Sequence, residues 1–268
     1  MLVREIEARG ILTPSKLPEV DYCINPYVGC AHGCVYCYAR FMKRFTGHTE
    51  DWGRFVDVRR NAVSLLQTKL HRTPDIGGRV LLGSVTDAYQ PLEEKYGLSR
   101  GLLRQLMSSR LAVSILTKSS LLLRDLDLLA QMDRCEVGLS ISTADDAVSR
   151  WLEPGASSSS SRMAVLRTLR RRKISNYLFL GPIIPQLTDV NAVLKPLVGH
   201  IDSVWAEGLN AGSGNWASLE AALHRHSPDL AETVWTLSRD DQYWLDKERE
   251  VNRICARFGL RLVGFFRH

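Results

Sequence analysis

The sequence predicts an α/β fold around a mainly parallel sheet, and three observations support this prediction. Short apolar runs of strand length alternate about six times with segments that carry leucine at helical spacing. Several runs are apolar at successive positions, which is typical of strands covered on both faces. Polar side chains gather just after the runs, at the edge where α/β barrels build their sites.

The predicted elements follow one another along nearly the whole chain. Strands are expected at 55–58, 79–83, 112–116, 136–140, 177–180, 201–206 and 260–265. Helices are expected at 39–45, 61–71, 98–107, 121–131, 161–172 and 189–198, with two more near the C-terminus. Residues 1–21, interrupted by Pro14 and Pro18, are expected to form an irregular arm, and 156–161 a surface loop. The predicted organisation is an arm at 1–21, a βα core at 22–210, and helices with a final strand at 211–268.

Length, hydropathy and charge narrow the class of protein. The chain has 268 residues and is 45% hydrophobic, which suits one large α/β domain. The N-terminus has no apolar leader region and no apolar run approaches ~18 residues, so we expect a soluble, cytoplasmic protein with no membrane partner. The net charge of +6 permits a nucleic-acid partner without requiring one. The densest basic run, Arg170 to Lys173, is interpreted as the solvated C-terminal end of a helix.

Three cysteines crowd into the stretch Asn25 to Arg40, which reads NPYVGCAHGCVYCYAR. Cys30, Cys34 and Cys37 form a C-x3-C-x2-C triplet, and such clustering in a cytosolic protein indicates metal. A zinc tetrahedron would need a fourth ligand, which His32 or Cys23 could supply. An iron–sulfur cubane held by three thiolates would keep one iron open. The scattered Cys23, Cys135 and Cys255 are interpreted as ordinary buried thiols, and His32 as a structural residue.

The triplet, with an aromatic residue before its third cysteine, resembles the signature of the radical S-adenosylmethionine (SAM) enzymes. Further stretches resemble the spore photoproduct lyase-like branch of that superfamily, from about Asp21 to about Asn210: SVTDAYQPLEEKYGLSRGLLRQL, TKSSLLLRDLDLL, SISTADDAVSRWLEP and GPIIPQLTD. The resemblance implies a partial (β/α)6 barrel with a C-terminal helical extension. It also implies a [4Fe-4S] cluster, SAM, and an external electron donor of the flavodoxin or ferredoxin type. Reductive cleavage of SAM would yield a 5′-deoxyadenosyl radical that abstracts hydrogen from substrate.

The same resemblance implies roles for individual residues. The cluster ligands would be Cys30, Cys34 and Cys37, and the residues that contact SAM would be Thr86, Lys118, Ser140 and Ser142. Tyr36 and Tyr38 match two tyrosines around the cluster, of which Tyr38 would relay a hydrogen atom. The physical sense is that the carboxylate and hydroxyl groups of SAM need fixed donors, which a lysine and serines supply.

One position departs from the pattern of the photoproduct lyases. Those enzymes carry a cysteine just after the second strand, which returns a hydrogen atom to the product radical, and Ser84 stands at about that place. An alcohol O–H bond is much stronger than a thiol S–H bond, so Ser84 cannot readily donate a hydrogen atom. The resemblance to the spore photoproduct lyase-like branch and the positive net charge favour nucleic acid as substrate. The missing cysteine favours a small molecule or peptide, or cleavage of a different carbon–sulfur bond of SAM. A zinc-binding nucleic-acid module is the non-enzymatic alternative. No pattern in the sequence predicts an oligomeric state.

Overall fold

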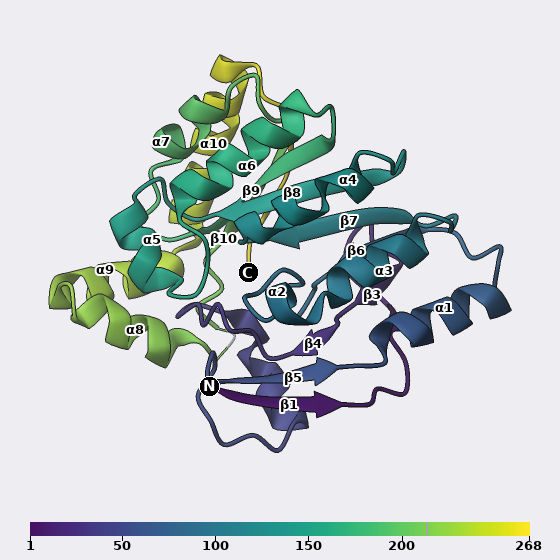
Figure 1. The fold of residues 1–268 in the computed structure, drawn as a ribbon. Helices are drawn as coiled ribbons and strands as arrows, with labels where there is room; N and C mark the ends of the chain where they lie inside the picture. Colours follow the sequence, from purple (N-terminus) through teal and green to yellow (C-terminus); the bar gives the residue numbers. More distant parts are fainter. Residues whose placement is uncertain (213) are drawn as a thin grey trace.

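The computed structural model describes residues 1–212 and 214–268 and is centred on an open eight-stranded sheet (Figure 1). The strand order is β11-β10-β9-β8-β7-β6-β3-β2. Six strands run parallel to their neighbours: β3 (Tyr22–Ile24), β6 (Arg79–Leu82), β7 (Ala112–Thr117), β8 (Cys135–Ile141), β9 (Ser175–Ile183) and β10 (Ser203–Gly208). β11 (Leu262–Phe266) adds a parallel edge, and β2 (Leu12–Pro14) an antiparallel one. The arrangement confirms the predicted α/β partial barrel.

Helices follow the strands and cover the outer face of this sheet. The α-helices are α1 (Ala62–Arg72), α2 (Glu93–Tyr96), α3 (Leu98–Leu106), α4 (Leu126–Leu129), α5 (Asp146–Leu152), α6 (Ser159–Arg171), α7 (Val190–Leu194), α8 (Trp216–His224), α9 (Pro228–Ser238) and α10 (Asp241–Phe258). The 3₁₀ helices are η1 (Tyr38–Phe45), η2 (Ser120–Asp125) and η3 (Lys195–Leu197). No helix in the described part of the chain combines the length and apolar character needed to cross a bilayer.

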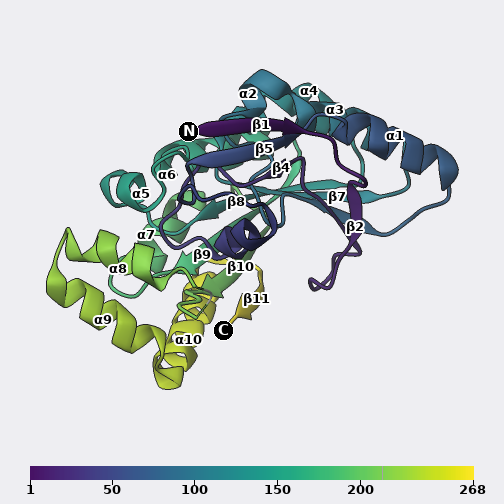
Figure 2. The same ribbon diagram turned by 90° about the horizontal axis from the view of Figure 1, so that it is seen from below.

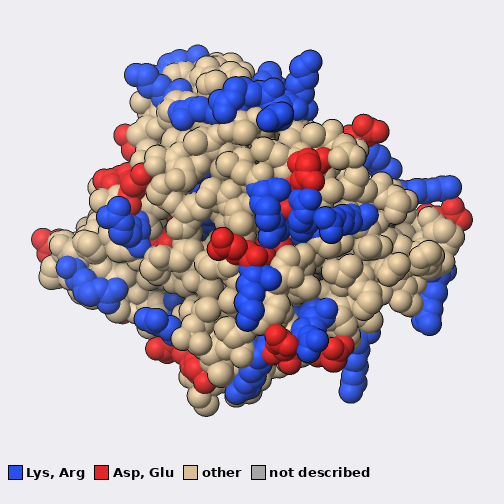
Figure 3. Space-filling view, in the orientation of Figure 1, with Lys and Arg blue, Asp and Glu red and all other residues tan. Residues whose placement is uncertain are grey.

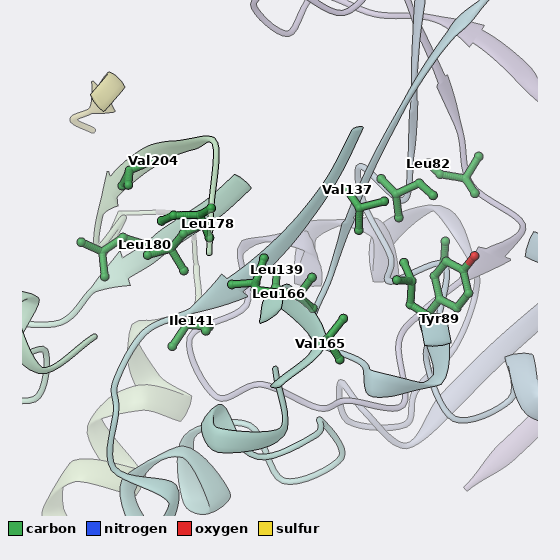
Figure 4. Packing of buried hydrophobic residues seen from close by; sticks show 14 of the residues in the cluster. Leu82, Tyr89, Val137, Leu139, Ile141, Val165, Leu166, Leu178, Leu180 and Val204 are labelled. Atoms are coloured by element: carbon green, nitrogen blue, oxygen red, sulfur yellow. The ribbon is translucent and has the colours of Figure 1, made fainter. Parts of the chain in front are cut away.

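The main core lies between the sheet and its helices. On α6, Met163, Val165, Leu166 and Leu169 are buried, a spacing that forms one apolar stripe of a helix. Figure 4 shows Val165 and Leu166 beside Leu139 of β8, and all three side chains are fully buried. At about 25 cal/mol per Å² of buried apolar surface, such contacts are the main source of stability of the barrel.

A second, three-stranded sheet corrects the prediction of an irregular N-terminal arm. β1 (Leu2–Ile6) pairs in parallel with β5 (Phe55–Arg59), and β4 (Tyr27–Val28) pairs antiparallel on the other side of β5. Figure 2 shows these strands as a layer apart from the large sheet. Phe55 and Trp52 pack with Cys30 and Ala39, so this small sheet supports the cysteine loop.

Several predicted elements differ in detail from those observed. The predicted helix 121–131 consists of η2 followed by α4, and 189–198 is divided into α7 and η3 because Pro196 cannot continue the backbone hydrogen bonds. Three helices, instead of two, precede the last strand. The serine stretch is only partly a loop, because Ser158 caps α6 and accepts a hydrogen bond from the Ser161 N–H. The basic run ends α6, as predicted.

Gly138 gives a test of the packing between β8 and β9. It stands opposite Tyr177 in the register, and a Cβ atom there would lie 2.2 Å from the ring carbon Cζ of Tyr177. Gly138→Ala should therefore lower the free energy of unfolding by about 1–3 kcal/mol, measured by urea denaturation. Gly77→Ala is the control, since nothing lies within 4 Å of a Cβ atom there. Equal stability of the two variants would contradict this account.

Candidate functional site

The cysteine loop runs from the end of β4 to the start of η1 and needs glycine at its first turn. Gly29 has φ +85°, and a Cβ atom there would lie 2.5 Å from the carbonyl oxygen of Phe55. Only glycine adopts this conformation without strain and tolerates such a close approach. The loop can therefore lie against β5 and turn its cysteines inward. Cys30 and Cys34 are buried, and Cys37 is half-buried.

The three thiols of the loop lie near enough to one another for their charges to interact. Burial raises the pKa of Cys34, and the charges of Cys37 and Cys30 act in the same direction. Burial likewise raises the pKa of Cys37, to about 11, with a further contribution from Cys30. Within the described residues, no group of three or more His, Cys, Asp or Glu side chains, these thiols included, has the geometry of a site for a single metal ion. Three neighbouring thiols without a fourth ligand do not make the closed tetrahedron of structural zinc, whereas they fit a cubane with one open iron.

Hydrogen bonds to the backbone carbonyls of the cysteine loop connect it to other parts of the chain. The Thr86 hydroxyl and the Gln90 amide donate to the Gly29 carbonyl, at 2.6 and 3.3 Å. The Gly155 N–H donates to the His32 carbonyl at 2.9 Å, and the Asn215 amide donates to the Tyr36 carbonyl at 2.5 Å. The loop is thus held from three separate parts of the chain.

His32 and Asp87 form a buried pair beside Cys30. Nδ1 of His32 lies 3.3 Å from Oδ2 of Asp87, and the imidazole is near enough to Cys30 for that thiol to influence its pKa. Burial alone would lower the pKa of His32, but Asp87 and Cys30 raise it to about 10. Burial would raise the pKa of Asp87, and the imidazolium lowers it to about 2. The pair is therefore charged at neutral pH. The structural role predicted for His32 fits its burial, and its contact with Cys30 adds a cation at the thiol.

Lys118 and Ser140 meet at the ends of β7 and β8. The Lys118 ammonium donates to the Ser140 hydroxyl at 2.8 Å and lies 5.8 Å from the ring centroid of Tyr36. The Ser140 hydroxyl in turn donates to the carbonyl of Gly181 at 2.9 Å. The positive charge of Lys118 also lowers the pKa of Cys34 in opposition to burial. This ammonium group therefore lies near Cys34 and the ring of Tyr36, and an ammonium group is a strong hydrogen-bond donor to carboxylates.

A buried ion pair that the sequence analysis missed holds Tyr36 and Ser142. Glu153 and Arg162 are 2% and 0% exposed and are paired with each other. The Glu153 carboxylate accepts hydrogen bonds from the Tyr36 phenol and, at 3.0 Å, from the Ser142 hydroxyl. Arg162 donates to the Ser140 carbonyl at 2.6 Å. Burial would raise the pKa of Glu153, but Arg162 outweighs it and lowers it to about 2.

Tyr38 and Ser84 are brought together at the exposed side of the loop. The Tyr38 phenol donates to the Ser84 carbonyl, and the Ser84 hydroxyl accepts a hydrogen bond from the Asn25 amide at 3.0 Å. Partial burial raises the pKa of Tyr38, with contributions from Cys37, Glu207 and Cys23. The fold therefore brings Cys23, on the strand next to β6, into the neighbourhood of this phenol.

The predicted site residues form one cluster, but their partners differ. Lys118 is paired with Ser140, whereas the hydroxyls of Ser142 and Thr86 are used by Glu153 and by the loop backbone. Asp87 belongs to the polar residues that follow β6, but no pattern in the sequence predicts its pairing with His32. No pattern indicates the buried pair either, because Glu153 directly after α5 and Arg162 within α6 are isolated charges in the sequence.

Comparison with known proteins agrees with this geometry. The sequence model of the radical SAM superfamily matches residues 24–193. The chain is 39% identical over 230 residues to the uncharacterized protein MJ0683 of Methanocaldococcus jannaschii, covering 86% of this chain and 85% of that one. It is 31% identical over 244 residues to the uncharacterized protein Rv2578c of Mycobacterium tuberculosis, covering 87% of this chain and 71% of the relative.

Solved structures share the fold. Spore photoproduct lyase complexed with dinucleoside spore photoproduct superposes with a TM-score of 0.70 at 17% identity, covering 98% of this chain and 82% of that chain. Streptococcus suis SuiB bound to S-adenosylmethionine gives a TM-score of 0.56 at 14% identity, covering 90% of this chain and 49% of SuiB. At such identities the likeness concerns the fold alone.

The buried pair makes a prediction about stability and pH. Glu153→Gln should lower the free energy of unfolding at neutral pH by about 3–5 kcal/mol, because it leaves the Arg162 charge buried and unpaired. The folded-state pKa of Glu153 is about 2, below its ordinary value of 4.5. Its stabilisation is therefore fully present above the ordinary value and is lost as pH falls toward 2, so the difference between variant and parent should shrink over that window.

Urea denaturation at several pH values measures this difference. The control is Glu250→Gln, which breaks a partly exposed pair with Lys247 and should cost less than about 1 kcal/mol. A cost for Glu153→Gln as small as that of the control would show that the pair does not stabilise the site.

Proposed function

This chain belongs to the radical SAM superfamily and is an enzyme whose cofactors are a [4Fe-4S] cluster and SAM, and we propose that it cleaves SAM reductively to abstract hydrogen from a substrate. When bound, cluster and SAM supply a 5′-deoxyadenosyl radical. The observation that carries the proposal is that one loop holds Cys30, Cys34 and Cys37 out of full contact with solvent, with the Lys118 ammonium 5.8 Å from the ring centroid of Tyr36 on the same loop. The reaction also requires an external reductant.

The residues of the rim would divide the work of holding these cofactors. The three thiols would hold the cluster. Lys118 would bind the carboxylate of SAM. Ser140 would orient the Lys118 ammonium group, which donates a 2.8 Å hydrogen bond to its hydroxyl. Tyr36 and Ser142 would have a structural role in the site, since their hydroxyls donate hydrogen bonds to the Glu153 carboxylate. Thr86 would act on the cysteine loop, because its hydroxyl donates to Gly29.

The inner face of the sheet continues from Ser140 toward a surface suited to a planar substrate. In the register, Ser140 stands opposite Phe179, and Phe179 opposite Trp205. Trp205 stacks on Phe266 with ring centroids 5.4 Å apart and planes inclined by 3°. Both rings are only partly buried. Aromatic faces of this kind stack on nucleobases, which supports a reaction on nucleic acid, like that of the spore photoproduct lyases.

A small molecule or peptide is the second candidate substrate, and Ser84 is the observation that favours it. A hydroxyl group at this position cannot readily return a hydrogen atom to a carbon radical, so the repair reaction of the photoproduct lyases would lack its hydrogen donor. Tyr38 donates to the Ser84 carbonyl, so its phenol lies beside this position. It would then be the group that relays a hydrogen atom there in the absence of a thiol at residue 84. Cleavage of another carbon–sulfur bond of SAM belongs to this second candidate.

The main test is the formation of 5′-deoxyadenosine. Reconstituted protein mixed with SAM and dithionite without oxygen should release this product, which chromatography detects. Cys30→Ala, Cys34→Ala and Cys37→Ala should each abolish it and lower the iron content, because two thiolates do not retain the cubane. Cys135→Ala, on β8 away from the loop, is the control and should keep both. Unchanged product from any loop variant would refute the assignment of ligands.

A second test concerns Lys118. Lys118→Met should weaken SAM binding by about 2 kcal/mol, or roughly thirtyfold, because a charge-assisted hydrogen bond to the carboxylate is lost. Calorimetry with reconstituted protein measures the affinity. Lys195→Met, on the exposed η3, is the matched control. If both variants bind SAM as the parent does, Lys118 is not the carboxylate ligand.

A further inference from the structure

The η1 helix carries an exposed apolar face that the catalytic role leaves unexplained. Within the described residues, the large aromatic side chains with the greatest exposure are Tyr38, Phe41 and Phe45, at 46%, 38% and 67%. All three belong to η1, which is drawn in dark blue in the foreground of Figure 2. We call Phe41, Arg44 and Phe45 the η1 face. Exposed aromatic groups gathered on one short helix indicate an interaction surface.

The charge of this helix is entirely positive. Arg40, Lys43 and Arg44 lie on it, and residues 38–45 contain no Asp or Glu. Arg40 is engaged with Ser218 at 2.6 Å, and the Lys43 ammonium donates to the Thr49 carbonyl at 2.8 Å. Arg44 makes no hydrogen bond or ion pair with the described residues. Its guanidinium lies 5.4 Å and 4.7 Å from the ring centroids of Phe41 and Phe45. It is therefore available to the carboxylate of a partner.

The position of the η1 face is next to the cysteine triplet. η1 starts at the residue after Cys37, which occupies the N-cap position without a capping hydrogen bond from its side chain. Cys37 is also the most accessible of the three cysteines, since Cys30 and Cys34 are 7% and 6% exposed and Cys37 is half-buried. The exposed Tyr38 is bonded directly to Cys37, so a short covalent path leads from this helix to the proposed cluster.

We propose that the η1 face docks an acidic electron-transfer protein that reduces the cluster. The proposal rests on the function proposed above. The step is the transfer of one electron: the donor, a flavin hydroquinone or a reduced iron–sulfur protein, loses it and the cluster gains it, with no covalent bond formed or broken. A few exposed aromatic groups with cations beside them suit a small, transient interface, which is the size that electron-transfer complexes use.

The contacts of Arg44 favour an acidic protein over nucleic acid at this face. Nucleobases stack on free aromatic faces, whereas the guanidinium of Arg44 already lies over both phenylalanine rings. The other dense group of cations, Arg170 to Lys173, ends α6 at the edge of the sheet where β9 begins. Figure 3 shows Lys and Arg gathered at the top of the molecule, over the ends of α6 and α10. The site lies at the opposite ends of the strands.

The experiment compares two reductants and two charge reversals. Arg44→Glu is set against Arg172→Glu, an equal change of charge at the exposed end of α6. With dithionite, both variants should form 5′-deoxyadenosine as fast as the parent. With a flavodoxin reduced by NADPH and its reductase, Arg44→Glu should be slower by about tenfold at low salt, because electrostatic steering is reversed. The Kd for flavodoxin, measured by biolayer interferometry, should rise by a similar factor, and Arg172→Glu should change neither quantity.

The outcomes separate this proposal from the function on which it rests. An Arg44→Glu variant that keeps both the flavodoxin-driven rate and the Kd overturns the docking proposal, and so does an equal loss in Arg172→Glu. Loss of affinity for single-stranded DNA with flavodoxin coupling intact would assign the face to nucleic acid instead. If the parent forms no 5′-deoxyadenosine with dithionite, the proposed function fails, while the Kd still reports on docking. Phe41→Ala with Phe45→Ala provides a second variant, which should weaken flavodoxin binding without reversing charge.

Discussion

The buried ion pair between Glu153 and Arg162 is the interaction on which the geometry of the site depends. Two fully buried charges are costly to desolvate, and they are tolerated because each also satisfies groups of the site. The carboxylate receives the hydroxyls of Tyr36 and Ser142, and the guanidinium binds the backbone of Ser140. One pair therefore fixes the position of the cysteine loop relative to β8. This is a reason for a polar network where an apolar core would be cheaper.

Two buried or half-buried cations, from His32 and Lys118, lie beside the thiols of the loop. The His32 imidazolium touches Cys30, and the Lys118 ammonium faces Cys34. Both cations are held by fixed partners, Asp87 and Ser140, so neither depends on solvent. Thiolates and a carboxylate are stabilised by nearby positive charge. The charge of Lys118 thus offsets part of the burial that raises the pKa of Cys34.

The sequence predicted those features of the fold and the site that depend on residues close together in the chain. The cysteine triplet and the polar ends of the strands were readable because their spacing alone carries the signal, and the order of βα units followed from it. The strand Leu2–Ile6 was missed because its partner β5 lies some fifty residues away, and no local pattern reports that pairing. Glu153 and Arg162 were missed for a similar reason, since a buried charge cannot be told from a surface charge without the fold. Thr86 is a different case. The family resemblance predicts that its hydroxyl contacts SAM, whereas in the structure this hydroxyl donates to the Gly29 carbonyl.

The two edge strands of the large sheet, β2 and β11, lie at opposite ends of its order and are not paired with each other. A closed barrel has no edge strands, because every strand pairs on both sides. In this sheet β2 and β11 each have one edge without a strand partner in the described part of the chain. Such edges present backbone N–H and C=O groups to which a further extended segment can add, a property that a complete ring of strands lacks.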